Sequence, residues 1–296
     1  MRPYFVRASA LLLMKTILYT AFALVAFAFN SILCRLALQS GEIDAVGFTL
    51  IRLVSGAVTL VGIYLLLGEK ETNTKRGSWL SAFFLFSYAV CFSFAYINLT
   101  TATGALVLFG AVQATMIFLA LLKGERPKFI EWLGLILALG GLVYLVFPNL
   151  SAPPILSSAL MAAAGISWGF YTLRGKESVN PLADTTGNFV RAVPMMILTA
   201  LPLVSQIYAS PKGIMFAVLS GAIASGIGYS IWYAALKFHT ATRAAILQLS
   251  VPVLAGFGGV ILLAEIVSAR LITATVLIIG GIALAILARG YGKNKV

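Results

Sequence analysis

Acidic residues and histidine are scarce in this chain. Its 296 residues include nine Asp and Glu and a single histidine, His239. All nine carboxylates lie between apolar runs or close to the ends of runs. Carriers that relay protons or sodium normally keep an acid at mid-membrane, and an intramembrane enzyme needs paired acids, a Ser–His pair or a metal cluster. We therefore expect no central carboxylate relay, no catalytic residue, no metal and no cofactor, and we interpret His239 as a solvated loop residue.

Cysteine and charge are also sparse. Cys34 and Cys91 both fall inside apolar runs, so they predict neither a disulfide framework nor a metal site. Charged residues make up 10% of the chain and hydrophobic residues 60%, against roughly 45–50% hydrophobic in soluble domains. The net charge of +12 is distributed over short loops without a basic helix, which argues against nucleic acid as a partner. The composition predicts an all-α integral membrane protein surrounded by lipid.

Most of the rest of the sequence consists of long apolar runs. A bilayer is crossed by roughly 20 apolar residues, and the chain has ten runs of about that length. The first follows Arg2, Arg7 and Lys15 like a signal peptide, but it is long and lacks a small-residue cleavage site, so we expect a retained span. The predicted spans are 15–38, 45–67, 78–98, 104–122, 128–147, 155–175, 182–204, 213–236, 243–263 and 269–288.

The runs form two copies of one pattern. Arg52 and Arg191 lie 139 residues apart, as do Thr101-Ala102-Thr103 and Thr240-Ala241-Thr242. Farther on, the offset is 140, between Glu125 and Glu265. Five spans in each half place the second copy upside down, which is the inverted repeat of carriers with a midplane site. We expect repeats over 1–150 and 151–296, joined by the linker 148–154.

Basic residues predict the orientation. Sixteen Lys and Arg fall on one side of the ten predicted spans and three (Arg35, Lys212 and Arg270) on the other. Because cytoplasmic loops collect positive charge, both termini are predicted to be cytoplasmic. The expected location is a bacterial-type inner membrane.

Two arginines inside predicted spans are the strongest candidates for a functional role. A guanidinium near mid-membrane costs from about 2.5 kcal/mol upward. Arg52 and Arg191 could each bind a substrate anion such as a carboxylate, or could donate to helix-end carbonyls as structural anchors. Their symmetric placement favours a structural role for at least one, because an asymmetric substrate rarely needs both. Asn188 lies three residues before Arg191, so one helix face can present both.

Other polar and aromatic residues within spans complete the predicted site. Asn30 and Ser31 can bind a ligand or a neighbouring helix, and aromatic rings can line a cavity or form an interfacial belt. Pro252 is expected to break the ninth span near Gln248 and expose backbone to a cavity. The predicted substrate-binding residues are Asn30, Ser31, Tyr88, Gln113, Trp168, Tyr171, Asn188, Arg191, Tyr229 and Gln248.

Several short motifs resemble those of the drug/metabolite transporter superfamily, EamA type. They are Gly124-Glu125, Trp132-Leu133-Gly134, Gly140-Gly141, Trp168-Gly169, Ala264-Glu265 and Gly280-Gly281. Span one departs from the pattern, with Phe29-Asn30 where a Trp-Gly-like pair is common. The resemblance implies ten helices and a cavity between the halves, lined by spans one, three, four, six, eight and nine.

Three classes of function compete at this point. The first is a carrier that exports or exchanges a small polar metabolite, most naturally an amino acid or related compound, by alternating access. The second is efflux of drugs or organic cations, which would favour a membrane-embedded acid that this chain lacks. The third is a non-transporting membrane protein or an intramembrane enzyme, for which the spans offer no catalytic constellation.

Overall fold

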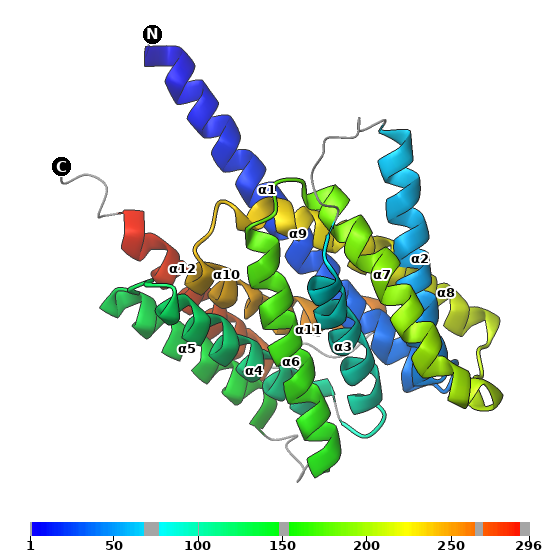
Figure 1. The fold of residues 1–296 in the computed structure, drawn as a ribbon. Helices are drawn as coiled ribbons and strands as arrows, with labels where there is room; N and C mark the ends of the chain where they lie inside the picture. The colour runs from blue at the N-terminus through cyan, green and yellow to red at the C-terminus, as the bar shows by residue number, and fades with distance from the viewer. Residues whose placement is uncertain (1, 68–76, 100, 148–153, 264–268, 291–296) are drawn as a thin grey trace.

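The computed structural model describes residues 2–67, 77–99, 101–147, 154–263 and 269–290 (Figure 1). The named elements in these ranges are all helical, and the extended backbone pairs only in an isolated antiparallel bridge between Ile43 and Ala209. In chain order the elements are α1 (Arg2–Leu38), α2 (Ala45–Leu66), α3 (Trp79–Ala95), α4 (Thr101–Leu122), α5 (Phe129–Val146), α6 (Ile155–Lys176), α7 (Pro181–Ala200), η2 (Leu201–Gln206), α8 (Pro211–Leu219), η3 (Ser220–Ile227), α9 (Gly228–Leu236), α10 (Ala241–Gln248), α11 (Ser250–Leu263) and α12 (Ala269–Gly290).

The predicted spans coincide with these helices. Eight helical stretches of the described chain are long and apolar enough to cross a membrane, and α3 and α5 are apolar but shorter. Many large apolar side chains, such as Leu66, Val58 and Val276, are exposed on the outside of the bundle, as expected where lipid replaces water. The predicted linker, apart from Pro154, lies outside the described residues, and so does Glu265.

Short polar side chains begin the helices. Asp44 accepts hydrogen bonds from the backbone N–H of Val46 and Gly47 at the start of α2, and Thr240 accepts from that of Arg243 at the start of α10. Asn180 and Ser210 do the same for α7 and α8, each followed by a proline at the first helical position. Side-chain capping satisfies amides that the helix itself leaves unpaired, and proline lacks the amide that would be unpaired there.

Two spans of the second half are interrupted. The eighth predicted span passes through a π-helical segment, η3, between α8 and α9. The ninth is divided at Leu249, where α10 ends and α11 begins. Pro252 cannot donate the backbone hydrogen bond that a continuous helix would make to Gln248, so the predicted break is confirmed. Both interruptions lie beside the cavity described below.

Helices in equivalent positions of the two sequence copies pack against each other. The pairs are α2 with α7, α5 with α12, and α4 with α10. Contacts between non-equivalent helices also occur in equivalent pairs. The packing of α3 on α6 corresponds to the packing of α1 on the eighth span, which consists of α8, η3 and α9. The packing of α2 on η3 corresponds to that of α3 on α7. Gly134 lies against Gly281 while Gly141 lies against Ile278, so α5 and α12, side by side in Figure 1, run in opposite directions.

Candidate functional site

A cavity lies between the helices at the centre of the bundle. It is narrow and partly open: about 30 Å³ is accessible to the centre of a water molecule, within about 380 Å³ that includes space open to solvent, and it is lined from α1, α3, α4, α6, α9, α10 and α11. These helices correspond to the spans that the family resemblance implies. The lining residues are Phe27, Asn30, Ser31, Tyr88, Phe92, Leu108, Phe109, Val112, Trp168, Tyr229, Gln248 and Val251.

Aromatic rings form much of the cavity wall. The ring centroid of Trp168 lies 4.7 Å from that of Tyr229 and 4.9 Å from that of Tyr88, and the perpendicular ring of Phe27 lies 5.2 Å away between centroids. Offset and edge-to-face contacts of this kind stabilise aromatic clusters. Trp168 Nε1 also donates to Gln248 Oε1 at 2.6 Å, which joins α6 to the end of α10. The wall is therefore a rigid aromatic surface with a few fixed polar groups.

Asn30 and Ser31 contribute polar groups from α1. Ser220 Oγ donates to Asn30 Oδ1 at 2.5 Å, so Asn30 connects α1 to η3 and also lines the cavity. Ser31 Oγ bonds the carbonyl of Phe27 in its own helix at 3.3 Å. Asn30 thus bonds a neighbouring helix, which is one of the two alternatives open from the sequence, and it does so at the edge of the cavity.

Four predicted site residues lie away from the cavity lining. Gln113 is buried and donates through Nε2 to the carbonyl of Ala245 at 2.6 Å, which holds α4 against α10. Tyr171 packs behind Trp168, at 5.7 Å between ring centroids. Asn188 Oδ1 accepts from the backbone N–H of Ser78 at 3.0 Å, at the start of α3.

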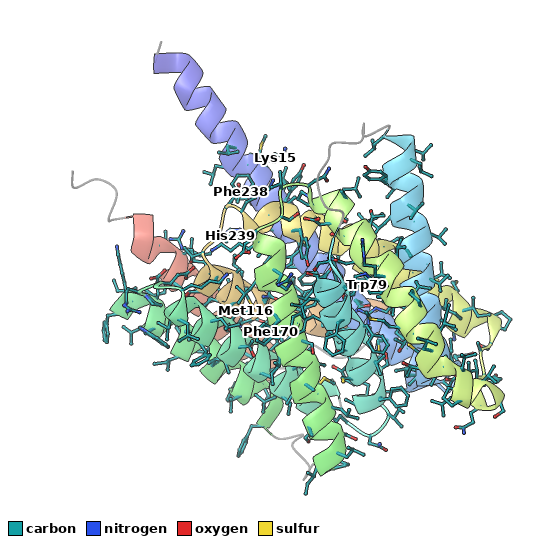
Figure 2. The ribbon with its side chains drawn as sticks, in the orientation of Figure 1. Lys15, Trp79, Met116, Phe170, Phe238 and His239 are labelled. Atoms are coloured by element: carbon teal, nitrogen blue, oxygen red, sulfur yellow. The ribbon has the colours of Figure 1, made fainter. Side chains whose placement is uncertain are left out.

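Arg191 is the fourth of these residues. Its Nη1 donates to the carbonyl of Gly187 one turn earlier in α7, at 2.9 Å. Its guanidinium carbon lies 5.8 Å from the ring centroid of Trp79, an exposed side chain at the start of α3 (Figure 2). Asn188 and Arg191, which were expected to approach the cavity with Trp168, Tyr229 and Gln248, are therefore not among the residues that line it.

The arginine beside the cavity is Arg52. Its side chain is 1% exposed, with Nε donating to Ser225 Oγ at 2.9 Å and Nη2 to the Tyr229 hydroxyl at 2.7 Å. Its guanidinium carbon lies 5.3 Å from the ring centroid of Tyr88. The sequence marked Arg52 as an unusual residue but contained no signal that separated it from Arg191. The apolar lining residues Phe27, Phe92, Leu108, Phe109, Val112 and Val251 were missed, because in sequence they do not differ from lipid-facing side chains.

Carboxylates occupy the loop ends, as the sequence indicates. Glu125 follows α4 and accepts from the backbone N–H of Ala241 at 2.9 Å and from the backbone N–H and hydroxyl of Thr242 at 3.2 and 2.9 Å. Burial alone would raise the pKa of Glu125, but these donors and nearby Lys176 outweigh it and lower the pKa below its ordinary value. Glu125 thus closes one end of the bundle by capping α10.

His239 is not the solvated residue expected from the sequence. Its Nε2 lies 2.9 Å from the hydroxyl of Thr20 in α1, at the turn between α9 and α10 (Figure 2). Burial, with a smaller effect of Arg243, lowers its pKa from 6.5 to about 4. His239 is therefore neutral near pH 7. Within the described ranges, no group of three or more His, Cys, Asp or Glu is placed to hold a metal ion.

Comparison with known proteins agrees with this architecture. The profile of the EamA-like transporter family matches residues 14–147 and again residues 156–287. An uncharacterised protein of Pseudomonas aeruginosa is 48% identical over 279 residues, covering 94% of this chain and 96% of its own. An uncharacterised transporter of Bacillus subtilis, YwfM, is 28% identical, covering 86% of this chain and 89% of its own.

A solved structure shares the fold. A protein crystal structure superposes with a TM-score of 0.78 at 20% identity, covering 93% of this chain and 98% of that one. The two family matches cover most of the sequence and divide it where the internal repeat does. This chain is an integral membrane protein that belongs to the EamA-like transporter family.

Proposed function

We propose that this transporter is a carrier for a small polar metabolite, with amino acids and related compounds as the candidate class. The observation that carries the proposal is the central cavity, because both halves of the chain contribute to its wall. A site at the boundary of two repeats can be exposed to either side when the repeats rock against each other. We propose that the protein exports or exchanges its substrate by alternating access.

The inverted-repeat part of the proposal is supported by the packing. A two-fold axis in the membrane plane makes equivalent helices run antiparallel, as α5 and α12 do. The same axis makes each contact between non-equivalent helices occur twice, and the equivalent pairs of contacts described above fit this pattern. We propose ten spans in two repeats, 1–150 and 151–296. From the basic-residue bias we propose an inner-membrane protein with both termini in the cytoplasm.

The proposed substrate-contacting residues are the predicted ones that line the cavity. They are Asn30, Ser31, Tyr88, Trp168, Tyr229 and Gln248. Amide and hydroxyl groups can orient a polar metabolite, and the rings can contact its side chain. The aromatic wall also suits an organic cation, which is the basis of a drug-efflux alternative. Arg52 beside the same wall disfavours a cation by charge repulsion, and no carboxylate is among the lining residues.

The carrier proposal is tested by measuring transport of labelled compounds by the purified protein. Proteoliposomes are loaded with single labelled amino acids and related carboxylates that stabilise the protein in a thermal-shift screen, since a ligand that binds the folded state raises its stability. Trp168→Phe removes the bond to Gln248 from the cavity wall and should lower flux several-fold. Trp79→Phe is the matched control, because Trp79 is 60% exposed and lies outside the lining. Equal flux in empty and protein-containing vesicles for every stabilising compound would contradict the proposal.

A further inference from the structure

Arg52 is a fully buried cation whose described partners are all neutral. Nε and Nη2 donate to the hydroxyls of Ser225 and Tyr229, and the rings of Tyr88 and Phe92 lie 5.3 and 5.9 Å from its guanidinium carbon. Its remaining nitrogen, Nη1, is buried without a hydrogen-bond partner. Hydroxyls and ring faces solvate a guanidinium partially but do not neutralise it.

A buried cation of this kind normally has an anionic partner. Removing a charge from water costs several kcal/mol, and an uncompensated charge is strongly destabilising. The ion pairs of the described residues join side chains in loops and at helix ends, such as Lys176 to Glu125 and Arg243 to Glu131, and none of them includes Arg52. No carboxylate in the described chain is therefore placed to compensate the charge.

The comparison with Arg191 shows that a structural anchor has a different environment. At the equivalent position of the second copy, Arg191 donates to a carbonyl of its own helix and lies 5.8 Å from the ring centroid of the exposed Trp79, and its own side chain is only partly buried. Arg52 is 1% exposed, and among the described residues its hydrogen bonds go to hydroxyls and not to a carbonyl. The two arginines thus separate into a helix-anchored residue and one that faces the molecule's centre.

Arg52 lies next to the cavity, because three of the residues that line the cavity also contact Arg52. Tyr88, Phe92 and Tyr229 line the cavity and also contact the guanidinium. A phenol that accepts a bond from Arg52 still has its own O–H to donate. The hydroxyls of Tyr229 and Tyr88 interact with each other and with Arg52, so together they form a polar edge of the cavity with the positive charge directly behind it.

We propose that Arg52, with Tyr229, is the anion-binding subsite of this cavity, and that the transported compound is a monocarboxylate with an apolar or aromatic body. The inference rests on the proposed carrier function and specifies its substrate. One guanidinium balances one negative charge, which favours a carboxylate over a doubly charged phosphate. The rest of the lining is mostly aromatic and aliphatic and has no acid for an ammonium group, so an α-amino group adds nothing to binding.

A series of compounds of similar shape tests the charge preference on the unmodified protein. The compounds are 3-phenylpropanoate, its neutral amide 3-phenylpropanamide, phenylalanine, 2-phenylethylamine and 2-phenylethylphosphonate, each measured by thermal shift and calorimetry in detergent. We expect 3-phenylpropanoate to bind at least about tenfold more tightly than the amide, the lower range for a charge-assisted hydrogen bond. Phenylalanine and the phosphonate should bind more weakly than 3-phenylpropanoate, and the amine should not bind measurably.

Paired substitutions then assign the preference to a residue. Arg52→Gln should abolish the difference between acid and amide, whereas Arg191→Gln, the matched change in the second copy, should retain it. Arg52→Lys should keep part of it, because an ammonium retains the charge but not the planar fork. Tyr229→Phe should weaken the binding of 3-phenylpropanoate more than that of 3-phenylpropanamide. If Arg52→Gln does not fold, Arg52→Lys, Tyr229→Phe and the compound series on the unmodified protein still decide the question.

The possible outcomes separate this inference from the carrier proposal. Equal binding of acid and amide, tighter binding of the amine or the phosphonate, or loss of the preference in Arg191→Gln but not Arg52→Gln would each overturn the anion subsite. Tighter binding of phenylalanine would overturn the restriction to compounds without an amino group and favour an amino acid as the substrate. Flux of labelled compounds without an acid preference would leave a carrier and overturn only the subsite. Acid-selective binding that depends on Arg52, without flux in proteoliposomes, would support the subsite and contradict the carrier.

Discussion

At the scale of single residues, the fold gives identical side chains different surroundings. Arg52 and Arg191 occupy equivalent positions of a repeated sequence, yet the first is buried among hydroxyls and rings while the second contacts the carbonyl of Gly187. The difference arises from the neighbours, because η3 and α9 present Ser225 and Tyr229 to Arg52 and α3 presents Trp79 to Arg191. A duplicated chain can in this way keep one arginine for structure and the other for binding.

Glu125 allows a residue-scale prediction about stability and pH. Glu125→Gln should lower the free energy of unfolding by about 1–2 kcal/mol at pH 7, because three charge-assisted hydrogen bonds lose their acceptor charge. The pKa of Glu125 is lower in the folded protein than its ordinary 4.5, so its contribution is complete above about pH 4.5 and is lost as the pH falls through the folded value. Thermal unfolding at pH 7 and pH 4 measures both effects.

The matched control is Glu177→Gln. Glu177 pairs with Lys123 at 2.6 Å, but its side chain is 69% exposed, and exposed pairs contribute about 0–1 kcal/mol. A loss in Glu177→Gln as large as that in Glu125→Gln would show that the cap on α10 is not what stabilises this end of the bundle.

At the scale of elements, irregular helices surround the cavity. The π-helical segment η3 brings Ser220 to Asn30 and Ser225 to Arg52, and the break at Leu249 places Gln248 at the end of α10. Segments of π-helix are frequent at functional sites. The proline pattern predicted the break in the ninth span, but no residue of η3 is diagnostic of a π-helix, so this feature depends on how α2 and α1 pack around it.

Gly221 provides the element-scale prediction. A methyl group at this position in η3 would collide with the backbone carbonyl of Arg52 and with Ser55 Oγ in α2. Because a backbone carbonyl cannot move aside easily, Gly221→Ala should lower the thermal stability by the equivalent of about 1–3 kcal/mol, as overpacking does. Fluorescence-monitored unfolding in detergent measures the loss.

Gly62→Ala in α2 is its control. No atom lies within 4 Å of the added methyl group, and alanine favours a helix over glycine by about 1 kcal/mol. The control should be neutral or stabilising. An equal loss in both variants would mean that helix packing at Gly221 is looser than the structure indicates.

At the scale of the whole molecule, the orientation in the membrane can be tested. In a background with Cys34 and Cys91 replaced by alanine, Tyr208→Cys should react with an impermeant maleimide in intact cells. Glu177→Cys should react only after permeabilisation. Both side chains are more than half exposed, which makes them accessible from their own side. The expectation follows from ten spans with cytoplasmic termini, and the opposite labelling pattern would contradict it.

Composition and periodic features were enough to predict the helical membrane fold, most helix limits, the duplication and the family. These properties are local or additive, because a span needs only its own apolar residues and a cap only its own loop. Six of the predicted site residues line the cavity for a similar reason, since polar and large aromatic groups within spans tend to face inward.

Only the tertiary structure decided what depends on partners distant in sequence. The sequence placed Arg191 among the predicted site residues and left the role of Arg52 open, and it treated His239 as a solvated loop residue although Thr20 lies beside it. The carboxylates closing the bundle likewise bind backbone amides more than one hundred residues away, as Glu125 binds Ala241. The environment of a buried charge depends on which helices surround it, and a linear pattern repeated twice predicts the same environment for both copies.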